Sequence, residues 1–311
     1  MFKGEDGSSS GSLRLEEFLK ESSTADVSRV LSAVAKSSVR VWEALPTERG
    51  VTGGTNPSGD RQAALDLFTN GEFSTSLMAT GAVAELASEE EPQPLRGRGS
   101  LHVAMDPLDG SSNIETNNPL GSIFGIYDSP LPCPGERIIA SAFVTYGPMV
   151  TLTFSTGKGV NRFGLVRRGS NFVFELAAQD LKIPDKPEVY GFGGLRREWI
   201  PPVERFVARL EQLGSKVRYC GTFVGDYNQV LKHGGIFGYP ALKNKPRGKL
   251  RLLYEAAPMA FVTKAAGGYS TDGFLDLLKV EAGELSATTP VYTGSHSITK
   301  ELERTVSSGS R

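Results

Sequence analysis

The sequence of 311 residues contains only two cysteines, Cys133 and Cys220. Two cysteines exclude a disulfide scaffold and a Cys-ligated zinc site. An excess of charge of one sign is also missing, because 34 basic residues stand against 35 acidic ones. That balance predicts no binding to nucleic acid or to an anionic membrane surface by charge alone. No apolar run approaches about 20 residues, so we expect no transmembrane helix.

A targeting segment is not evident either. Residues 1–25 lack the cationic stretch and apolar stretch of a secretory signal, and they lack the Arg-rich character of a transit peptide. We therefore expect a cytoplasmic protein, while a plastid location stays open because a cleaved transit peptide would leave no trace. The 39% apolar and 22% charged residues are typical of a globular protein of one large or two medium domains.

The spacing of apolar residues changes along the chain. Asp26 can cap a helix, whose apolar face would be Val27, Val30, Leu31, Val34, Val41 and Trp42. Helical spacing follows Asp60 as well, and strand-like spacing follows in residues 101–175. Pro184 and Pro187 then precede a second half that mixes both periods. This order predicts a layered α+β fold, an α/β sandwich, with one half over residues 12–185 and the other over 186–306. We expect strands at 101–105, 122–127, 138–146, 149–154, 164–167, 171–175, 217–219 and 236–239, and helices at 201–213, 226–232 and 252–266.

The most informative string is Asp106-Pro107-Leu108-Asp109-Gly110-Ser111-Ser112-Asn113, which directly follows an apolar strand. Two carboxylates three residues apart on a turn can converge on one hard cation such as Mg²⁺, which prefers oxygen ligands. Gly110, Ser111 and Ser112 offer backbone N–H groups to a phosphate. Carboxylates beside a phosphate would repel it unless a metal lies between them. The alternative is a capped turn that binds no ligand.

Three further groups could serve the same site. Glu89 and Glu90 stand one short connection before the strand that ends at Asp106, although an acidic triplet is commonly a solvated loop. Asp66 lies among apolar neighbours at helical spacing, where an unpaired carboxylate is unusual, and the alternative is a surface position. Glu255 lies in an apolar stretch that begins with two cations, and an amphipathic helix start is the alternative there. Those two cations are Lys249 and Arg251.

The string 106–113, followed by Gly121-Ser122-Ile123-Phe124-Gly125, resembles the sugar bisphosphatases. These are the fructose-1,6- and sedoheptulose-1,7-bisphosphatases, a family of metal-dependent phosphoric monoester hydrolases. The resemblance recurs at Ser88-Glu89-Glu90, at Arg218-Tyr219 and at 248–255, and it covers roughly residues 12–305. It implies the sugar-phosphatase fold, with two halves that each hold a mixed sheet.

The resemblance also implies roles for individual residues. Glu90 and Asp66 match the carboxylates that activate the attacking water, and Mg²⁺ is implied as cofactor, two or three ions per site, with Mn²⁺ as a substitute. The implied metal ligands are Glu89, Asp106, Asp109, Glu255 and the carbonyl of Leu108. The implied substrate-binding residues are Gly110, Ser111, Ser112 and Asn113 for the scissile phosphate, and Arg218, Tyr219, Tyr239 and Lys249, with support from Arg251, for the distal phosphate.

The sugar and the assembly are less directly implied. Asn228-Gln229 and Gly193-Gly194 resemble the sedoheptulose branch, whereas Tyr239-Pro240 resembles the fructose branch. We expect removal of the 1-phosphate of sedoheptulose 1,7-bisphosphate, with fructose 1,6-bisphosphate or dual activity as the alternative. In the fructose enzymes the residue that matches Arg218 reaches the neighbouring subunit, so we expect a homodimer or homotetramer. The competing classes are an inositol-phosphate-type monophosphatase and a sugar-phosphate-binding regulator without activity.

Overall fold

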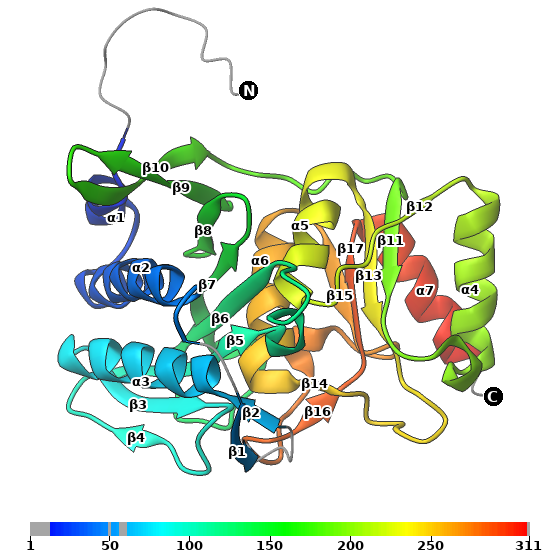
Figure 1. Ribbon diagram of the computed structural model, residues 1–311. Helices are drawn as coiled ribbons and strands as arrows, with labels where there is room; N and C mark the ends of the chain where they lie inside the picture. Colours follow the sequence, from blue (N-terminus) through cyan, green and yellow to red (C-terminus); the bar gives the residue numbers. More distant parts are fainter. Residues whose placement is uncertain (1–12, 49–50, 56–60, 310–311) are drawn as a thin grey trace, which may run out of the picture.

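The computed structural model describes residues 13–48, 51–55 and 61–309 of the chain. Two mixed sheets lie side by side, and helices cover and separate them (Figure 1). Helices α5 (Phe223–His233) and α6 (Ala257–Ala265) contact strands of both sheets, so they form a layer between them. The layered α+β sandwich with two mixed-sheet halves is therefore confirmed. The division at residue 185 stays a prediction.

The larger sheet has eight strands in the order β10-β9-β8-β7-β6-β5-β3-β4. All neighbours in it are antiparallel except β3 and β5, which run parallel. The strands of residues 101–175 are all present, each within a few residues of its predicted bounds. The bounds are β3 Val83–Ser88, β4 Leu95–Arg96, β5 Leu101–Asp109, β6 Leu120–Tyr127, β7 Ile138–Tyr146, β8 Val150–Ser155, β9 Asn161–Arg168 and β10 Asn171–Ala178.

Three helices cover the outer face of this sheet: α1 (Leu15–Ser22), α2 (Ala25–Ala44) and α3 (Ala64–Ala79). The predicted apolar face of α2 packs into the same core cluster as the sheet, with all of it buried except Trp42, which is half-buried. Its cap was predicted wrongly, since the Thr24 hydroxyl rather than Asp26 accepts the hydrogen bond from a first-turn N–H. Asp60 lies outside the described residues, and α3 begins only at Ala64.

The smaller sheet has five strands in the order β12-β11-β13-β17-β15, and helices α4 and α7 pack together on its outer side. β11 runs parallel to both β12 and β13, and the other pairs are antiparallel. The expected strand at 217–219 is only the short edge strand β12. The bounds are β11 Val189–Phe192, β12 Lys216–Val217, β13 Gly235–Tyr239, β15 Tyr269–Thr271, β17 Val291–Gly294, α4 Pro201–Gln212 and α7 His296–Ser308.

Two small two-stranded sheets complete the described part of the chain. One pairs β1 (Val51–Thr55) with β2 (Arg61–Ala63), and the other pairs β14 (Leu250–Arg251) with β16 (Thr288–Thr289). The expected helix at 252–266 is split, because a π-helical turn, Leu252–Ala256, precedes α6. Such turns are frequent at functional sites, and this one carries Glu255.

Candidate active site

An irregular strand end brings Asp106 and Asp109 to one side of the large sheet. Residues three apart on a regular strand point to opposite faces. Here Asp106 lies opposite Ile123 and Asp109 opposite Gly121 of β6, so β5 contains one extra residue between them. This bulge turns both carboxylates the same way. The turn expected to begin at Asp106 is therefore still part of the strand, which continues to Asp109.

The start of α5 holds the Asp109 carboxylate. Its two oxygens accept hydrogen bonds from the backbone N–H groups of Phe223 (3.1 Å) and Val224 (2.8 Å). A helix N-terminus offers unpaired donors and a favourable dipole to an anion. Burial nevertheless raises the pKa of Asp109 to about 6, against the effect of these two donors. The carboxylate is thus fixed in place before any ligand binds.

Asp106 and Glu255 are two further buried carboxylates, and the charge of Glu255 acts on Asp106. Burial, and then the charge of Glu89, raises the pKa of each well above its ordinary value. One Asp106 oxygen accepts from the N–H of Leu108 at 3.0 Å, and one Glu255 oxygen accepts from the N–H of Arg251 at 2.6 Å. The second bond fixes Glu255 across the π-helical turn, so that its side chain points back toward β5.

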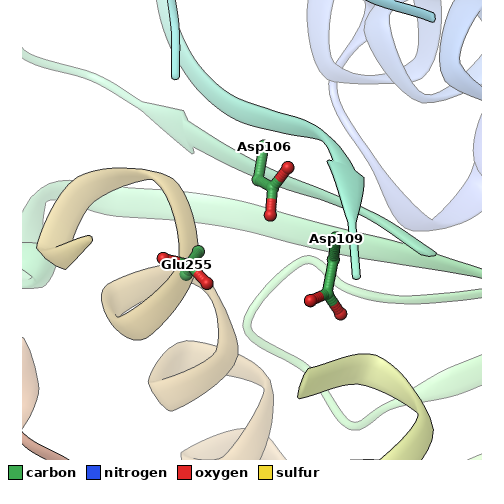
Figure 2. Close-up of side chains that lie close together, drawn as sticks. All are labelled: Asp106, Asp109 and Glu255. Atoms are coloured by element: carbon green, nitrogen blue, oxygen red, sulfur yellow. The ribbon is translucent and has the colours of Figure 1, made fainter. Parts of the chain in front are cut away.

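Figure 2 shows the three carboxylates together, Asp106 and Asp109 from the strand and Glu255 from the helical turn that faces it. Each offers one oxygen, and these oxygens lie within 4.8 Å of one another. Loss of solvation is the main reason for the raised pKa of all three, and repulsion from neighbouring carboxylates adds to it, from Glu89 for Asp106 and Glu255 and from Asp226 for Asp109. A divalent cation with oxygen ligands would relieve both penalties. The donor set therefore fits a hard metal ion.

The acidic turn Glu89–Glu91, which follows β3, lies against this cluster. The charge of Glu89 raises the pKa of Asp106 and of Glu255, and its Oε1 lies 3.5 Å from Nε of Arg251, so Glu89 lies near the cluster. Glu90 is half-buried on the same turn. Asp66 is buried on α3, so the surface alternative for it is wrong. The acidic turn is likewise partly buried rather than a solvated loop.

The predicted phosphate cradle follows the bulge. Gly110 has a left-handed backbone (φ +83°), and a Cβ there would lie 2.0 Å from Cγ2 of Thr222, so only glycine fits. Ser111 and Ser112 begin a short 3₁₀ turn with their side chains at least partly exposed. Asn113 differs from the expectation: its amide nitrogen donates to the carbonyls of Pro119 (3.2 Å) and Cys220 (2.9 Å). That side chain anchors the loop in this structure.

The residues predicted for the distal phosphate gather around a glycine of the small sheet. A Cβ on Gly193 would lie 2.5 Å from the Tyr239 ring and 3.1 Å from Oη of Tyr219, so the two tyrosines converge there. Nζ of Lys249 lies 5.9 Å from the centre of the Tyr239 ring. Lys249 also lowers the pKa of Asp109 and of Glu255, although burial outweighs this effect. Its charge therefore acts on the carboxylate cluster while it lies over the Tyr239 ring.

The two arginines predicted for the distal phosphate, Arg218 and Arg251, have different surroundings. Arg218 is exposed, and its guanidinium donates to the carbonyl of Val217 at 2.8 Å. Arg251 was expected to support the distal pocket, but it lies on the metal side. Its guanidinium approaches Glu89 and donates to the carbonyl of Ser286 at 2.9 Å. Proximity to Glu89 gives Arg251 a part in balancing the charge of the carboxylate cluster.

Sequence reasoning missed three residues that assemble the site. Asn70 of α3 binds the acidic turn, and Thr222 caps α5 by accepting from Gly225. Asp226 is buried and accepts from the backbone N–H groups of Cys220 (2.6 Å) and Gly221 (3.3 Å), which ties the loop after Tyr219 to α5. The spacing of Asn70, one helical turn after Asp66, is the one signal in the sequence that could have found the first of them.

Comparison with known proteins agrees with this geometry. The family model "Fructose-1-6-bisphosphatase, N-terminal domain" matches residues 12–175, and "Fructose-1-6-bisphosphatase, C-terminal domain" matches 183–307. The chain belongs to the fructose-1,6-bisphosphatase family. It is accordingly an enzyme, a phosphoric monoester hydrolase. The expected resemblance and the enzyme class are both confirmed, and the alternative of an inactive binding protein is not supported.

Relatives in this family cover nearly the whole chain. Fructose-1,6-bisphosphatase class 1 of Natronomonas pharaonis is 39% identical over 278 residues, which cover 88% of this chain and 96% of that protein. The class 1 protein of Pelobacter propionicus is 37% identical and covers 94% of this chain and 92% of its own. The holo structure of Leishmania major fructose-1,6-bisphosphatase matches with a TM-score of 0.90 at 30% identity, over 96% of this chain and 99% of that one.

The family is metal-dependent, in agreement with the buried carboxylate cluster. Among the helices of the described residues, none has both the length and the apolar character needed to cross a bilayer.

Proposed function

We propose that the protein hydrolyses the 1-phosphate of a sugar bisphosphate, with fructose 1,6-bisphosphate as the substrate. The observation that carries the proposal is that Lys249 lies over the Tyr239 ring while its charge lowers the pKa of Asp109 and of Glu255. A metal site for one phosphate and a cationic, tyrosine-lined site for another thus share one residue. That arrangement suits a substrate with two phosphates and disfavours the monophosphatase alternative.

The preference for fructose revises the order of our expectation. The class 1 proteins of Natronomonas pharaonis, Haloarcula marismortui and Pelobacter propionicus are all named fructose-1,6-bisphosphatase. Asn228, which suggested the sedoheptulose branch, is engaged in packing: its amide binds Arg162 (2.6 Å) and Thr145 (2.8 Å) on the large sheet. It therefore says little about the sugar. Sedoheptulose 1,7-bisphosphate stays the second candidate, because Gly193 leaves no side chain between the two tyrosines.

Each implied role is part of the same proposal. The metal ligands would be Glu89, Asp106, Asp109, Glu255 and the Leu108 carbonyl, with two or three Mg²⁺ per site or Mn²⁺ in its place. When bound, the metal would neutralise phosphate charge and lower the pKa of a coordinated water. The backbone donors of Gly110, Ser111 and Ser112 would orient the 1-phosphate for in-line attack.

Proton transfer and distal binding would fall to the remaining residues. Glu90 would accept the proton of the attacking water, with Asp66 as the second carboxylate of this relay. Tyr219, Tyr239 and Lys249 would bind the distal phosphate and so position the ester. Arg218 is exposed and could complete the site of a second subunit in a homodimer or homotetramer. The assembly and a cytoplasmic location stay predictions.

The test is parallel measurement of phosphate release from the two bisphosphates in the presence of Mg²⁺. We expect kcat/KM to favour fructose 1,6-bisphosphate by at least about tenfold, which corresponds to about 1.4 kcal/mol of transition-state discrimination. The opposite ratio would assign the sedoheptulose reaction. In both cases Asp109→Asn should abolish Mg²⁺-dependent turnover. Release from neither sugar, or full activity of Asp109→Asn, would refute the proposal.

A further inference from the structure

A buried amide on α3 uses both of its ends on the acidic turn. Asn70 is 5% exposed, and its Nδ2 donates to Oε1 of Glu91 at 2.8 Å. Its Oδ1 accepts from the hydroxyl of Ser88 at 2.7 Å. An asparagine with both amide ends bound to one four-residue segment fixes that segment against its helix.

The Ser88 hydroxyl also binds the backbone of the acidic turn. It accepts from the N–H of Glu90 at 3.3 Å, while the Ser88 carbonyl accepts from the N–H of Glu91 at 3.2 Å. On the other side, the N–H of Glu89 donates to the carbonyl of Met105 on β5 at 3.1 Å. The turn is therefore held between α3 and the strand that carries Asp106, with Glu89 and Glu90 in the middle.

The same helix face carries Asp66. Residues 66 and 70 lie one turn apart on α3, so their side chains are neighbours on its surface. Both are buried. Any shift of the acidic turn relative to α3 would change how Glu90 lies relative to Asp66, and how Glu89 lies relative to Asp106.

We propose that Asn70, acting through Ser88, is a positioning residue that sets Glu89 for metal binding and Glu90 beside Asp66 for proton transfer. This inference rests on the proposed function for the roles of the three carboxylates. Asn70 itself touches neither substrate nor metal in this scheme. Residues that orient metal ligands from behind commonly change metal affinity or activity by about 10–100-fold when they are removed.

The experiment compares Asn70→Ala with Asn161→Ala in the full chain. Asn161 of β9 is a matched control, because it is 6% exposed and its amide oxygen also accepts a hydrogen bond, from the N–H of Asp180. It lies on the large sheet, separated from β5 by β6, β7 and β8. Three quantities are measured: Mn²⁺ affinity by electron paramagnetic resonance, kcat and KM for the bisphosphate, and the thermal unfolding midpoint.

We expect Asn70→Ala to weaken Mn²⁺ binding and to lower kcat by about tenfold each, with KM within about twofold at saturating metal. Asn161→Ala should lower only the unfolding midpoint. The double variant Asn70→Ala/Ser88→Ala should lose no more than the worse single variant, because both act through the same bonds. Additive losses, or unchanged Mn²⁺ affinity in a folded Asn70→Ala, would overturn the proposal.

Two further controls keep the outcomes separate. Glu91→Ala removes one of the same bonds from the exposed end of the turn, and it should weaken Mn²⁺ binding in the same direction if Asn70→Ala fails to fold. Unchanged Mn²⁺ affinity in Glu91→Ala would then count against the proposal. A wild type that binds Mn²⁺ but hydrolyses neither bisphosphate refutes the proposed function alone, since the Mn²⁺ titrations still decide the role of Asn70. A wild type that binds no Mn²⁺ refutes both.

Discussion

Replacing Gly110 by alanine should disable the site while leaving every proposed ligand in the chain. The new Cβ would lie 2.0 Å from Cγ2 of Thr222, where ordinary contacts between such atoms lie at 3.4–4 Å. The backbone at Gly110 is also left-handed, which costs an alanine about 1–2 kcal/mol. The strand end and the start of α5 must therefore move apart by more than an ångström.

That movement falls on the two groups that flank the glycine. Asp109 accepts hydrogen bonds from the start of α5, which Thr222 caps, and Ser111 is the next residue of the phosphate cradle after Gly110. A misplacement of about 1 Å can cost about 10²-fold in rate, so we expect kcat/KM of Gly110→Ala to fall by about that factor. The free energy of unfolding should fall by about 2–4 kcal/mol, as the sum of overpacking and backbone strain.

Two further variants separate the clash from the strain. Gly169→Ala has the same left-handed requirement (φ +62°) with no atom within 4 Å of its Cβ, so it should lose stability but keep its activity. Adding Thr222→Ser to Gly110→Ala removes the clashing methyl and keeps the hydroxyl that accepts from Gly225. The double variant should therefore recover most of the activity that Gly110→Ala loses. Wild-type kcat/KM in Gly110→Ala, or no recovery with Thr222→Ser, would refute the reasoning.

Three other predictions concern charge. Because burial raises the pKa of Asp109 to about 6, the metal-free folded chain retains a proton that the unfolded chain releases near pH 4. Its free energy of unfolding should therefore fall as pH rises from about 4 to about 6, and Mg²⁺ should reduce that fall. The measurement is the thermal unfolding midpoint against pH, with EDTA and with Mg²⁺, and equal slopes under the two conditions would contradict the prediction. Lys249→Met should raise KM for the bisphosphate by about 10–100-fold and weaken Mg²⁺ activation, while Lys249→Arg keeps the charge and should lose less; equal kinetics of the two variants would count against the shared role. Glu85→Leu removes a buried carboxylate that binds His102 (2.9 Å) and the N–H of Leu131 (3.0 Å), so unfolding by denaturant should show a loss of about 2–3 kcal/mol with kcat unchanged.

Candidate site residues stand out in the sequence more clearly than the elements that carry them. The Asp106–Asn113 string, Glu255 and the buried Asp66 could be found because carboxylates in apolar surroundings stand out against composition. The large sheet was predictable because its strands follow one another along the chain and each alternates or is continuously apolar. Strand β3 was missed, since its partner β5 is parallel and the short Val83–Ser88 run follows a helix directly.

What could not be predicted depends on contacts distant in sequence. The extra residue before Asp109 is visible only against β6, and the donors for its carboxylate come from residues 223 and 224. The side-chain amide of Asn113 could bind a phosphate, yet it donates to the carbonyl of Cys220, 107 positions away in the sequence. Arg251 was grouped with Lys249 because they are two residues apart, but its guanidinium lies near Glu89 and donates to the carbonyl of Ser286, whereas Lys249 lies over the Tyr239 ring. Tertiary pairing decided each of these cases.

The carboxylate cluster has a mechanical consequence. Asp106 and Asp109 belong to the large sheet, whereas Glu255 and the start of α5 belong to the layer that carries the small sheet. A cation held by all three carboxylates would add a further link between these two parts, beside the hydrogen bonds from the start of α5 to Asp109 and those between Asn228 and both Arg162 and Thr145. Loading the ion and fixing the angle between the two parts would then be one equilibrium. Any ligand that favours a different angle would therefore change the affinity for the metal, even when it binds far from the carboxylates.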